Sequence, residues 1–143
     1  MREILFRAKR IDNGEWVSGY YVYDYAHNAH FIFKNQLVCP NCINDRRIDY
    51  SVCDYEIDPD TLCQYTGKSD EDGKKIFEGD IVGFIDLYST ENGYSESSCL
   101  GEVIWSKEEC CFYVTNRLSA ESWEVLDECK VVGNVFDNKE LLD

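Results

Sequence analysis

Apolar and polar residues alternate in short runs along most of the chain, and this two-residue period predicts β-strands. The first run covers residues 4–9. The Asn13-Gly14 turn after it supplies the backbone geometry of a tight hairpin, so residues 15–23 should return antiparallel to it. We expect further strands at residues 30–33, 48–52, 62–65, 74–77, 81–88, 100–105, 110–115 and 130–136.

Short strands at this spacing predict a mainly β fold with little helix, in which antiparallel strands form a partly closed barrel or a sandwich with a smaller second β unit. The length of 143 residues suits one domain over 1–143, with subdomains at about 1–66 and 67–143 as the alternative. Residues 89–98 should form a polar link. Residues 119–128 fit a helix or a strand equally well, and 138–142 should form a capped turn.

Acidic residues outnumber basic ones two to one, with 28 Asp and Glu against 14 Lys and Arg, for a net charge of −14. Residues 1–47 carry a net +2, whereas residues 48–143 carry −16. This charge disfavours direct binding of nucleic acid, because a phosphate backbone needs clustered cations. The acidic part is either a solvated surface or one that attracts a cationic partner.

No apolar run is long enough for a signal-peptide core or a membrane span, so we predict a cytoplasmic protein without membrane contact. In that compartment the eight cysteines should be reduced thiols rather than disulfides. Cys110 and Cys111 are neighbours in a strand-like run. Their side chains should therefore point to opposite faces, with at least one packed as a small hydrophobe.

A Cys-Pro-Asn-Cys stretch at residues 39–42 has the spacing of a metal knuckle or a redox pair. A zinc site would need two further ligands, which could be two histidines or two more cysteines. The candidate ligands are Cys39 and Cys42, completed by His27 and His30 or by Cys53 and Cys63. Neither set has the usual zinc-finger spacing, so we favour a free dithiol and predict no metal and no cofactor.

Two acidic turns could carry chemistry. Residues 70–73 fail as an EF-hand, because the loop would start at Lys68 and end at Gly79 instead of a glutamate. Glu78 and Asp80 could form an acid/base pair, but a turn in which Asp80 accepts backbone N–H groups is favoured. No hydrolase or phosphate-loop motif occurs, so an enzyme is not predicted.

Seven aromatic residues lie between residues 16 and 33, too many for one face of a sheet. Some should therefore decorate an outer face and contact a partner, unless residues 39–53 or a second copy of the chain covers that face. The predicted binding residues come from this cluster and from the acidic turns. They are Tyr20, Tyr21, Tyr65, Asp70, Glu78 and Asp80.

Three segments resemble the YopX family of phage and prophage proteins in order and spacing. They are residues 2–8 with Gly14 to Tyr21, the run from Gln64 to Val82 with its Tyr-Thr-Gly and Glu-Gly-Asp-Ile-Val, and residues 131–142. The resemblance implies a small, mainly β protein that acts in the bacterial host, with no established activity. The sequence departs from the family pattern at Lys68, where leucine is usual, and in residues 39–53.

These observations favour a non-enzymatic accessory protein that binds a host or phage protein in the host cytoplasm. One alternative is an acidic DNA mimic that occupies a DNA-binding host protein, which requires the carboxylates on one continuous surface. The other is an enzyme for a small molecule or nucleotide, with Tyr65, Asp70, Glu78 and Asp80 around a cleft.

Overall fold

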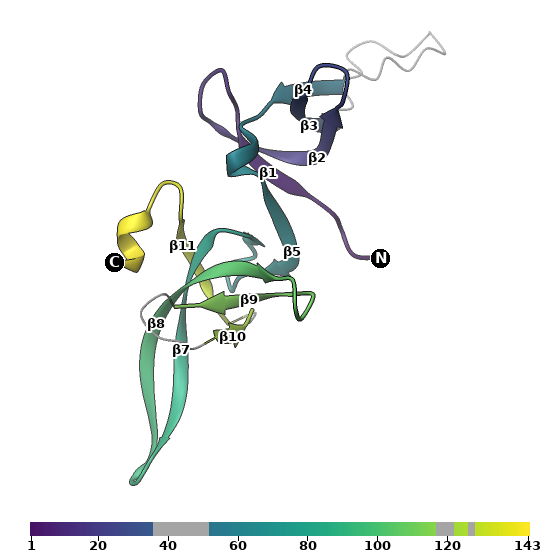
Figure 1. Ribbon diagram of the computed structural model, residues 1–143. Coiled ribbons are helices and arrows are strands. Elements are labelled where there is room, and N and C mark those ends of the chain that lie inside the picture. Colours follow the sequence, from purple (N-terminus) through teal and green to yellow (C-terminus); the bar gives the residue numbers. More distant parts are fainter. Residues whose placement is uncertain (36–51, 117–121, 126–127) are drawn as a thin grey trace, which may run out of the picture. The chain divides into compact units, whose positions relative to one another are not determined.

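The computed structural model describes residues 1–35, 52–116, 122–125 and 128–143, and this part of the chain is almost entirely β (Figure 1). Two short 3-10 helices, η1 (Pro59–Thr61) and η2 (Lys139–Leu142), are the helical elements in it. The strands are β1 (Phe6–Lys9), β2 (Trp16–Asp24), β3 (Ala29–Asn35), β4 (Val52–Glu56), β5 (Cys63–Ser69), β6 (Lys75–Phe77), β7 (Asp80–Thr90), β8 (Gly93–Ser106), β9 (Cys111–Thr115), β10 (Ser122–Glu124) and β11 (Lys130–Asn134).

All strand pairs are antiparallel, which confirms the predicted mainly β fold with little helix. One sheet has the strand order β4-β3-β2-β1-β5-β6 and the other β10-β9-β8-β7-β11. The chain divides into two compact units: an N-terminal unit of residues 3–64, and a C-terminal unit of residues 65–143 with Met1 and Arg2. Strand β5 pairs with β1 at Gln64 and with β6 at Tyr65.

The N-terminal unit begins with the predicted hairpin. The Arg10 N–H donates to the Glu15 carbonyl at 2.9 Å, and Gly14 has a φ of 71°. The loop is longer than the two-residue turn that Asn-Gly suggests, because Asn13 does not share the positive φ. Four fully or almost fully buried side chains form the core: Ala8, Val17, Ile32 and Ile57.

A larger core fills the C-terminal unit. Its members come from β6, β7, β8 and β9 and from the segment between β10 and β11. The buried members are Ile76, Val82, Phe84, Val103, Val114, Val125 and Cys129. Gly101 allows this packing, since a Cβ there would lie 2.3 Å from Val114.

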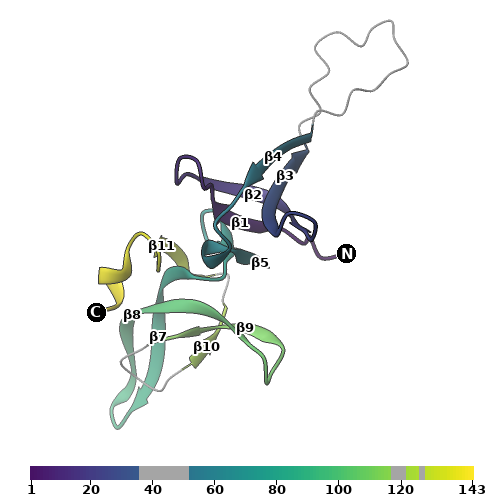
Figure 2. The same ribbon diagram turned by 45° about the horizontal axis from the view of Figure 1, so that its top comes forward.

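Strands β7 and β8 form one long hairpin, and Figures 1 and 2 show the two running side by side to its tip. Pairing continues without interruption from Ile81–Glu102 to Thr90–Gly93. The prediction of a polar link over 89–98 is therefore wrong. Polar residues there pair across a two-stranded ribbon with no sheet core beneath it, so the apolar alternation that marks a half-buried strand is missing.

Two further expectations are settled in the described residues. Ser122–Glu124 forms β10 rather than a helix, paired with β9; the rest of the segment around it, 117–121 and 126–127, lies outside them. The terminal turn is present as η2, but the Asn138 side chain does not cap it. Instead Asn138 Oδ1 accepts the Asn134 N–H at 3.3 Å. No helix in the described part of the chain combines the length and apolar character needed to span a bilayer.

Candidate functional site

The outer face of the N-terminal sheet carries two rows of side chains that cross three strands. In one row Tyr20 of β2 lies opposite Phe33 of β3, which lies opposite Asp54 of β4. In the other row Val22, Phe31 and Glu56 follow the same order. Directly opposed residues point to the same side of a sheet, so each row runs from an apolar side chain through a phenylalanine to a carboxylate.

This face is open and hollowed. A cleft of about 600 Å³ lies over it, lined by the residues Val22, Tyr23, Asp24, Tyr25, Ala26, Phe31, Phe33 and Asp54. We call it the aromatic cleft. Tyr20 is 51% exposed beside it, and Tyr25 is 87% exposed. The Tyr23 and Tyr25 rings meet edge to face with centroids 4.5 Å apart, a favoured aromatic geometry.

Asp24 supplies a second carboxylate at the cleft and shapes the turn between β2 and β3. Its Oδ2 lies 2.7 Å from His27 Nδ1, and its Oδ1 accepts the Ala26 N–H at 2.9 Å. These hydrogen bonds, the one to His27 first, lower the pKa of Asp24, so the carboxylate is ionised at neutral pH. The cleft therefore combines aromatic walls with fixed negative charge.

Tyr21 faces the other side of the sheet from Tyr20. Its hydroxyl lies 2.7 Å from His30 Nδ1, and its ring centroid is 5.6 Å from that of Phe6. Burial raises the pKa of the Tyr21 hydroxyl. Of Tyr20 and Tyr21, the two aromatic-cluster residues among the three tyrosines predicted for binding, the structure places only Tyr20 beside the aromatic cleft.

Asp70 holds the turn between β5 and β6 and joins it to β11. Its Oδ1 accepts the N–H groups of Asp72 and Lys74 at 3.0 and 2.8 Å, and its Oδ2 accepts that of Val131 at 3.0 Å. The hydrogen bond from Val131 is the largest of the effects that lower the pKa of Asp70. The side chain is 6% exposed, so its contacts are those of a structural carboxylate.

Asp80 serves the next turn in the same way. The side chain is 1% exposed, and Oδ2 accepts the Phe77 N–H at 2.8 Å. Glu78 is half-buried beside Gly79, whose φ of 76° makes the turn. Tyr65 is buried, with its ring centroid 5.5 Å from that of Phe77. Of the four residues considered for chemistry, Tyr65 thus lies within β5 and the other three lie at the turns before and after β6, where Asp70 and Asp80 accept backbone N–H groups.

The structure describes only some of the candidate zinc ligands. Cys39, Cys42 and the Cys53 side chain lie outside the described residues. Cys63 is buried, and its Sγ donates to the Thr61 carbonyl at 3.3 Å. Nδ1 of each histidine is already in a contact, that of His27 with Asp24 and that of His30 with Tyr21. Among the described residues no group of three or more metal-binding side chains comes together.

The sequence places Phe31 and Phe33 in the aromatic cluster, but neither they nor Asp54 are among the predicted binding residues. Phe31 and Phe33 form the middle of each row, and Asp54 ends one. Strand alternation could have separated Tyr20 from Tyr21. The position of Asp54 depends on the pairing of β3 with β4 across residues 36–51, which no local pattern reveals.

Family membership rests on a match over almost the whole chain. A family model described as YopX protein matches residues 5–143. The chain belongs to the YopX family. The match confirms the resemblance of the three sequence segments, and it includes every residue of the YopX aromatic cleft. No curated protein matches the chain.

A solved structure supports the fold of this YopX chain. The crystal structure of protein EF1440 from Enterococcus faecalis matches it with a TM-score of 0.51 and 21% sequence identity, over 100% of both chains. At this identity the likeness establishes the fold alone. The function of the YopX chain must be argued from its own residues.

Proposed function

We propose that the protein is a non-enzymatic binding module that takes a cationic segment of a host or phage protein into the aromatic cleft. The observation that carries this proposal is the pair of cross-strand rows, Tyr20–Phe33–Asp54 and Val22–Phe31–Glu56. Each row places an aromatic surface directly beside a carboxylate. The bacterial host cytoplasm, predicted from the sequence, is where such a partner is met.

The chemistry of the rows selects the partner. Lysine and arginine carry a long apolar stem and a charged head, so the stem can lie along the Phe31 and Phe33 rings while the head reaches Asp54 or Glu56. Aromatic faces also attract cations directly. An acidic segment is repelled by these carboxylates, and a purely apolar segment leaves them without an opposite charge. The net charge of −14 adds a long-range attraction for the same partner.

Binding can be tested before a natural partner is known. The probe is a synthetic peptide that alternates arginine with leucine, and the controls replace each arginine with glutamate or glutamine. Amide NMR signals should shift at residues 22–25, 31–33 and 54 with the arginine peptide only. Shifts confined to the β7–β8 hairpin, or equal shifts with the neutral peptide, would contradict the proposal.

Variants then connect the cleft to a natural partner. Phe33→Ser and Asp54→Asn should each weaken peptide binding, and both should lose the same host protein from a lysate pull-down at low salt. Asp86→Asn on β7 is the matched control, since it removes one carboxylate in the other unit. Release of the captured protein by duplex DNA would instead favour the DNA-mimic hypothesis.

A further inference from the structure

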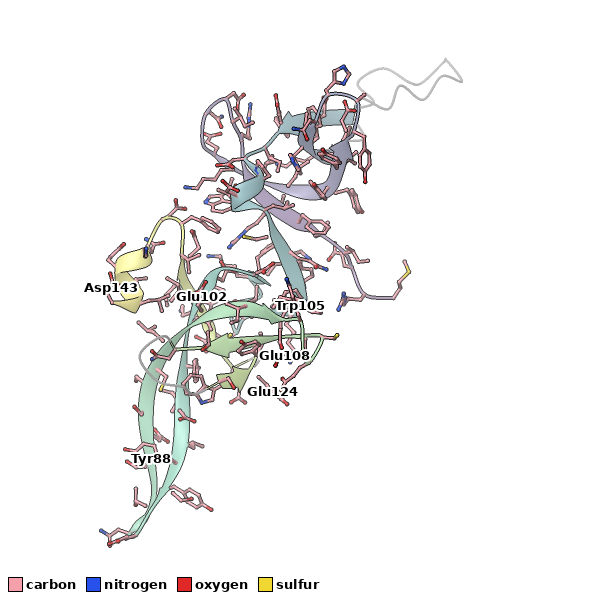
Figure 3. The ribbon with its side chains drawn as sticks, viewed as in Figure 1. Tyr88, Glu102, Trp105, Glu108, Glu124 and Asp143 are labelled. Carbon is pink, nitrogen blue, oxygen red and sulfur yellow. The ribbon has the colours of Figure 1, made fainter. Side chains whose placement is uncertain are left out.

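The C-terminal unit contains a cleft whose charged side chains are mainly cationic, in contrast to the carboxylates of the aromatic cleft. It has a volume of about 320 Å³, and we call it the thiol pocket. Among the described residues, two cations, two thiols, two aromatic rings and one carboxylate line it. The lining residues are Arg2, Thr66, Lys68, Trp105, Cys110, Cys111, Phe112, Glu124 and Val125. Trp105 and Glu124 are labelled in Figure 3.

Both cysteines line this pocket, but Cys110 is not part of a strand as the sequence predicted. Cys110 has a φ of 54°, in the left-handed region that cysteine rarely adopts, and β9 begins only at Cys111. The alternation of a regular strand therefore does not apply to this pair. Both residues are exposed, so neither is packed as a core hydrophobe. Unusual backbone of this kind clusters at functional sites.

The two thiols differ in their surroundings. Cys110 Sγ donates to the Lys107 carbonyl at 3.6 Å, whereas Cys111 Sγ lies 3.9 Å from Glu109 Oε2. Partial desolvation, followed by the Glu109 carboxylate, raises the pKa of Cys111, so this thiol stays protonated at neutral pH. Thiolate is the nucleophilic form of cysteine. The raised pKa therefore disfavours Cys111 as the nucleophile, and Cys110 is the other exposed thiol that lines the pocket.

The two cations come from the N-terminal end of the chain and from β5. A Cβ on Gly67 would lie 3.2 Å from Arg2 Cδ, so the arginine stem lies along the strand that carries Lys68. The Thr66 hydroxyl accepts the Lys68 N–H at 3.2 Å and donates to the Ile76 carbonyl at 2.8 Å. In a protein with twice as many acidic as basic residues, a pocket with two cations beside one carboxylate favours an anionic ligand.

We propose that Cys110 is a reversible thiolation site for an anionic low-molecular-weight disulfide, whose carboxylates are attracted by Arg2 and Lys68. The Cys110 thiol loses its proton to solvent, and the thiolate attacks one sulfur of the disulfide. The disulfide bond breaks, a mixed disulfide forms on Cys110, and the other half leaves as a thiolate that takes up a proton. The small disulfide is the oxidant: one protein thiol is oxidised and one small thiol is released.

The mixed disulfide should persist rather than pass to Cys111. Adjacent Cα atoms are about 3.8 Å apart, less than the roughly 4.4–6.8 Å that an unstrained disulfide spans. Closing a ring between Cys110 and Cys111 is therefore unfavourable. A small thiol in excess can reach the exposed Cys110 and reverse the modification.

The test uses glutathione disulfide on the reduced full-length protein, with peptide mass spectrometry to locate and time the modification. Cys110 should gain one glutathionyl group, and Cys110→Ser should gain none at this position. The double variant Arg2→Gln/Lys68→Gln should react about fivefold more slowly, the factor that one screened ion pair gives. Lys139→Gln, which removes an exposed lysine elsewhere in this unit, should react like wild type.

A neutral probe separates charge attraction from plain thiol exposure. With 2-hydroxyethyl disulfide the double variant should react at the wild-type rate. Equal rates with glutathione disulfide, modification of Cys111 in place of Cys110, or a disulfide between the two would each overturn the proposal. Thermal unfolding of every variant, with Cys110→Asn as a second variant suited to the left-handed backbone, verifies that the fold is kept.

Discussion

Neighbouring residues of β3 lie on opposite faces of the sheet and differ in burial. Ile32 is 0% exposed in the core of the N-terminal unit, whereas Phe31 and Phe33 on either side of it line the aromatic cleft. The strand therefore has apolar side chains on both faces, but the N-terminal core accounts for only one. The difference teaches that neighbouring apolar residues of this strand divide between the buried core and the more exposed outer face.

The same division separates the carboxylates. Asp70 and Asp80 are buried and accept backbone N–H groups, whereas Asp54 and Glu56 are exposed along β4. Removing a buried carboxylate should damage the fold. Removing an exposed one should change only binding.

The largest effect should come from the inner face. Ile32→Ala should lower the free energy of unfolding by about 2–5 kcal/mol, because it removes fully buried methyl groups and leaves a cavity. Urea unfolding monitored by tryptophan fluorescence measures this change. A loss below about 1 kcal/mol would mean that the inner face is not the covered one.

Asp80→Ala should cost about 1–3 kcal/mol, since the Phe77 N–H would lose its buried acceptor. Asp80→Asn is the matched control, because its amide oxygen can still accept this hydrogen bond. The two variants are compared by thermal unfolding. Equal losses in both would show that the negative charge matters more than the hydrogen bond.

Acid should reveal the contribution of Asp70. Its pKa is lowered below 3.8 in the folded state by backbone hydrogen bonds, the one from Val131 first, so it stabilises the fold above that pH. This stabilisation is lost as the pH falls through the folded-state pKa. The urea midpoint between pH 5 and pH 2 should fall more steeply in wild type than in Asp70→Asn, and parallel curves would contradict the assignment.

The smallest effect on stability should come from the outer face. Phe33→Ser should change the free energy of unfolding by about 1 kcal/mol or less, because the ring is only half-buried, yet it should weaken binding of the arginine peptide. Isothermal titration calorimetry alongside thermal unfolding tests both parts. A loss as large as that of Ile32→Ala would erase the distinction between the two faces.

The fold could largely be predicted because its signals are local. Asn13-Gly14 and residues 70–73 mark turns through their own chemistry, and the core strands alternate visibly. The aromatic cleft could be predicted only in part. Which tyrosine faces outward depends on register, and the place of Asp54 depends on strands that meet from distant parts of the chain. No sequence pattern predicts the left-handed backbone conformation of Cys110.

The long β7–β8 hairpin also bears on how the molecule assembles. The first pair at its tip is Thr90 with Gly93. The pairs from there to Ile81–Glu102 can form one after another, because each closes only a short loop and costs little loop-closure entropy. Hairpins of this kind form in about 1–10 μs. We expect this ribbon to nucleate the C-terminal unit, with β9 joining next. Strand β11, which must return from far along the chain to meet β7, should dock late and set the folding rate.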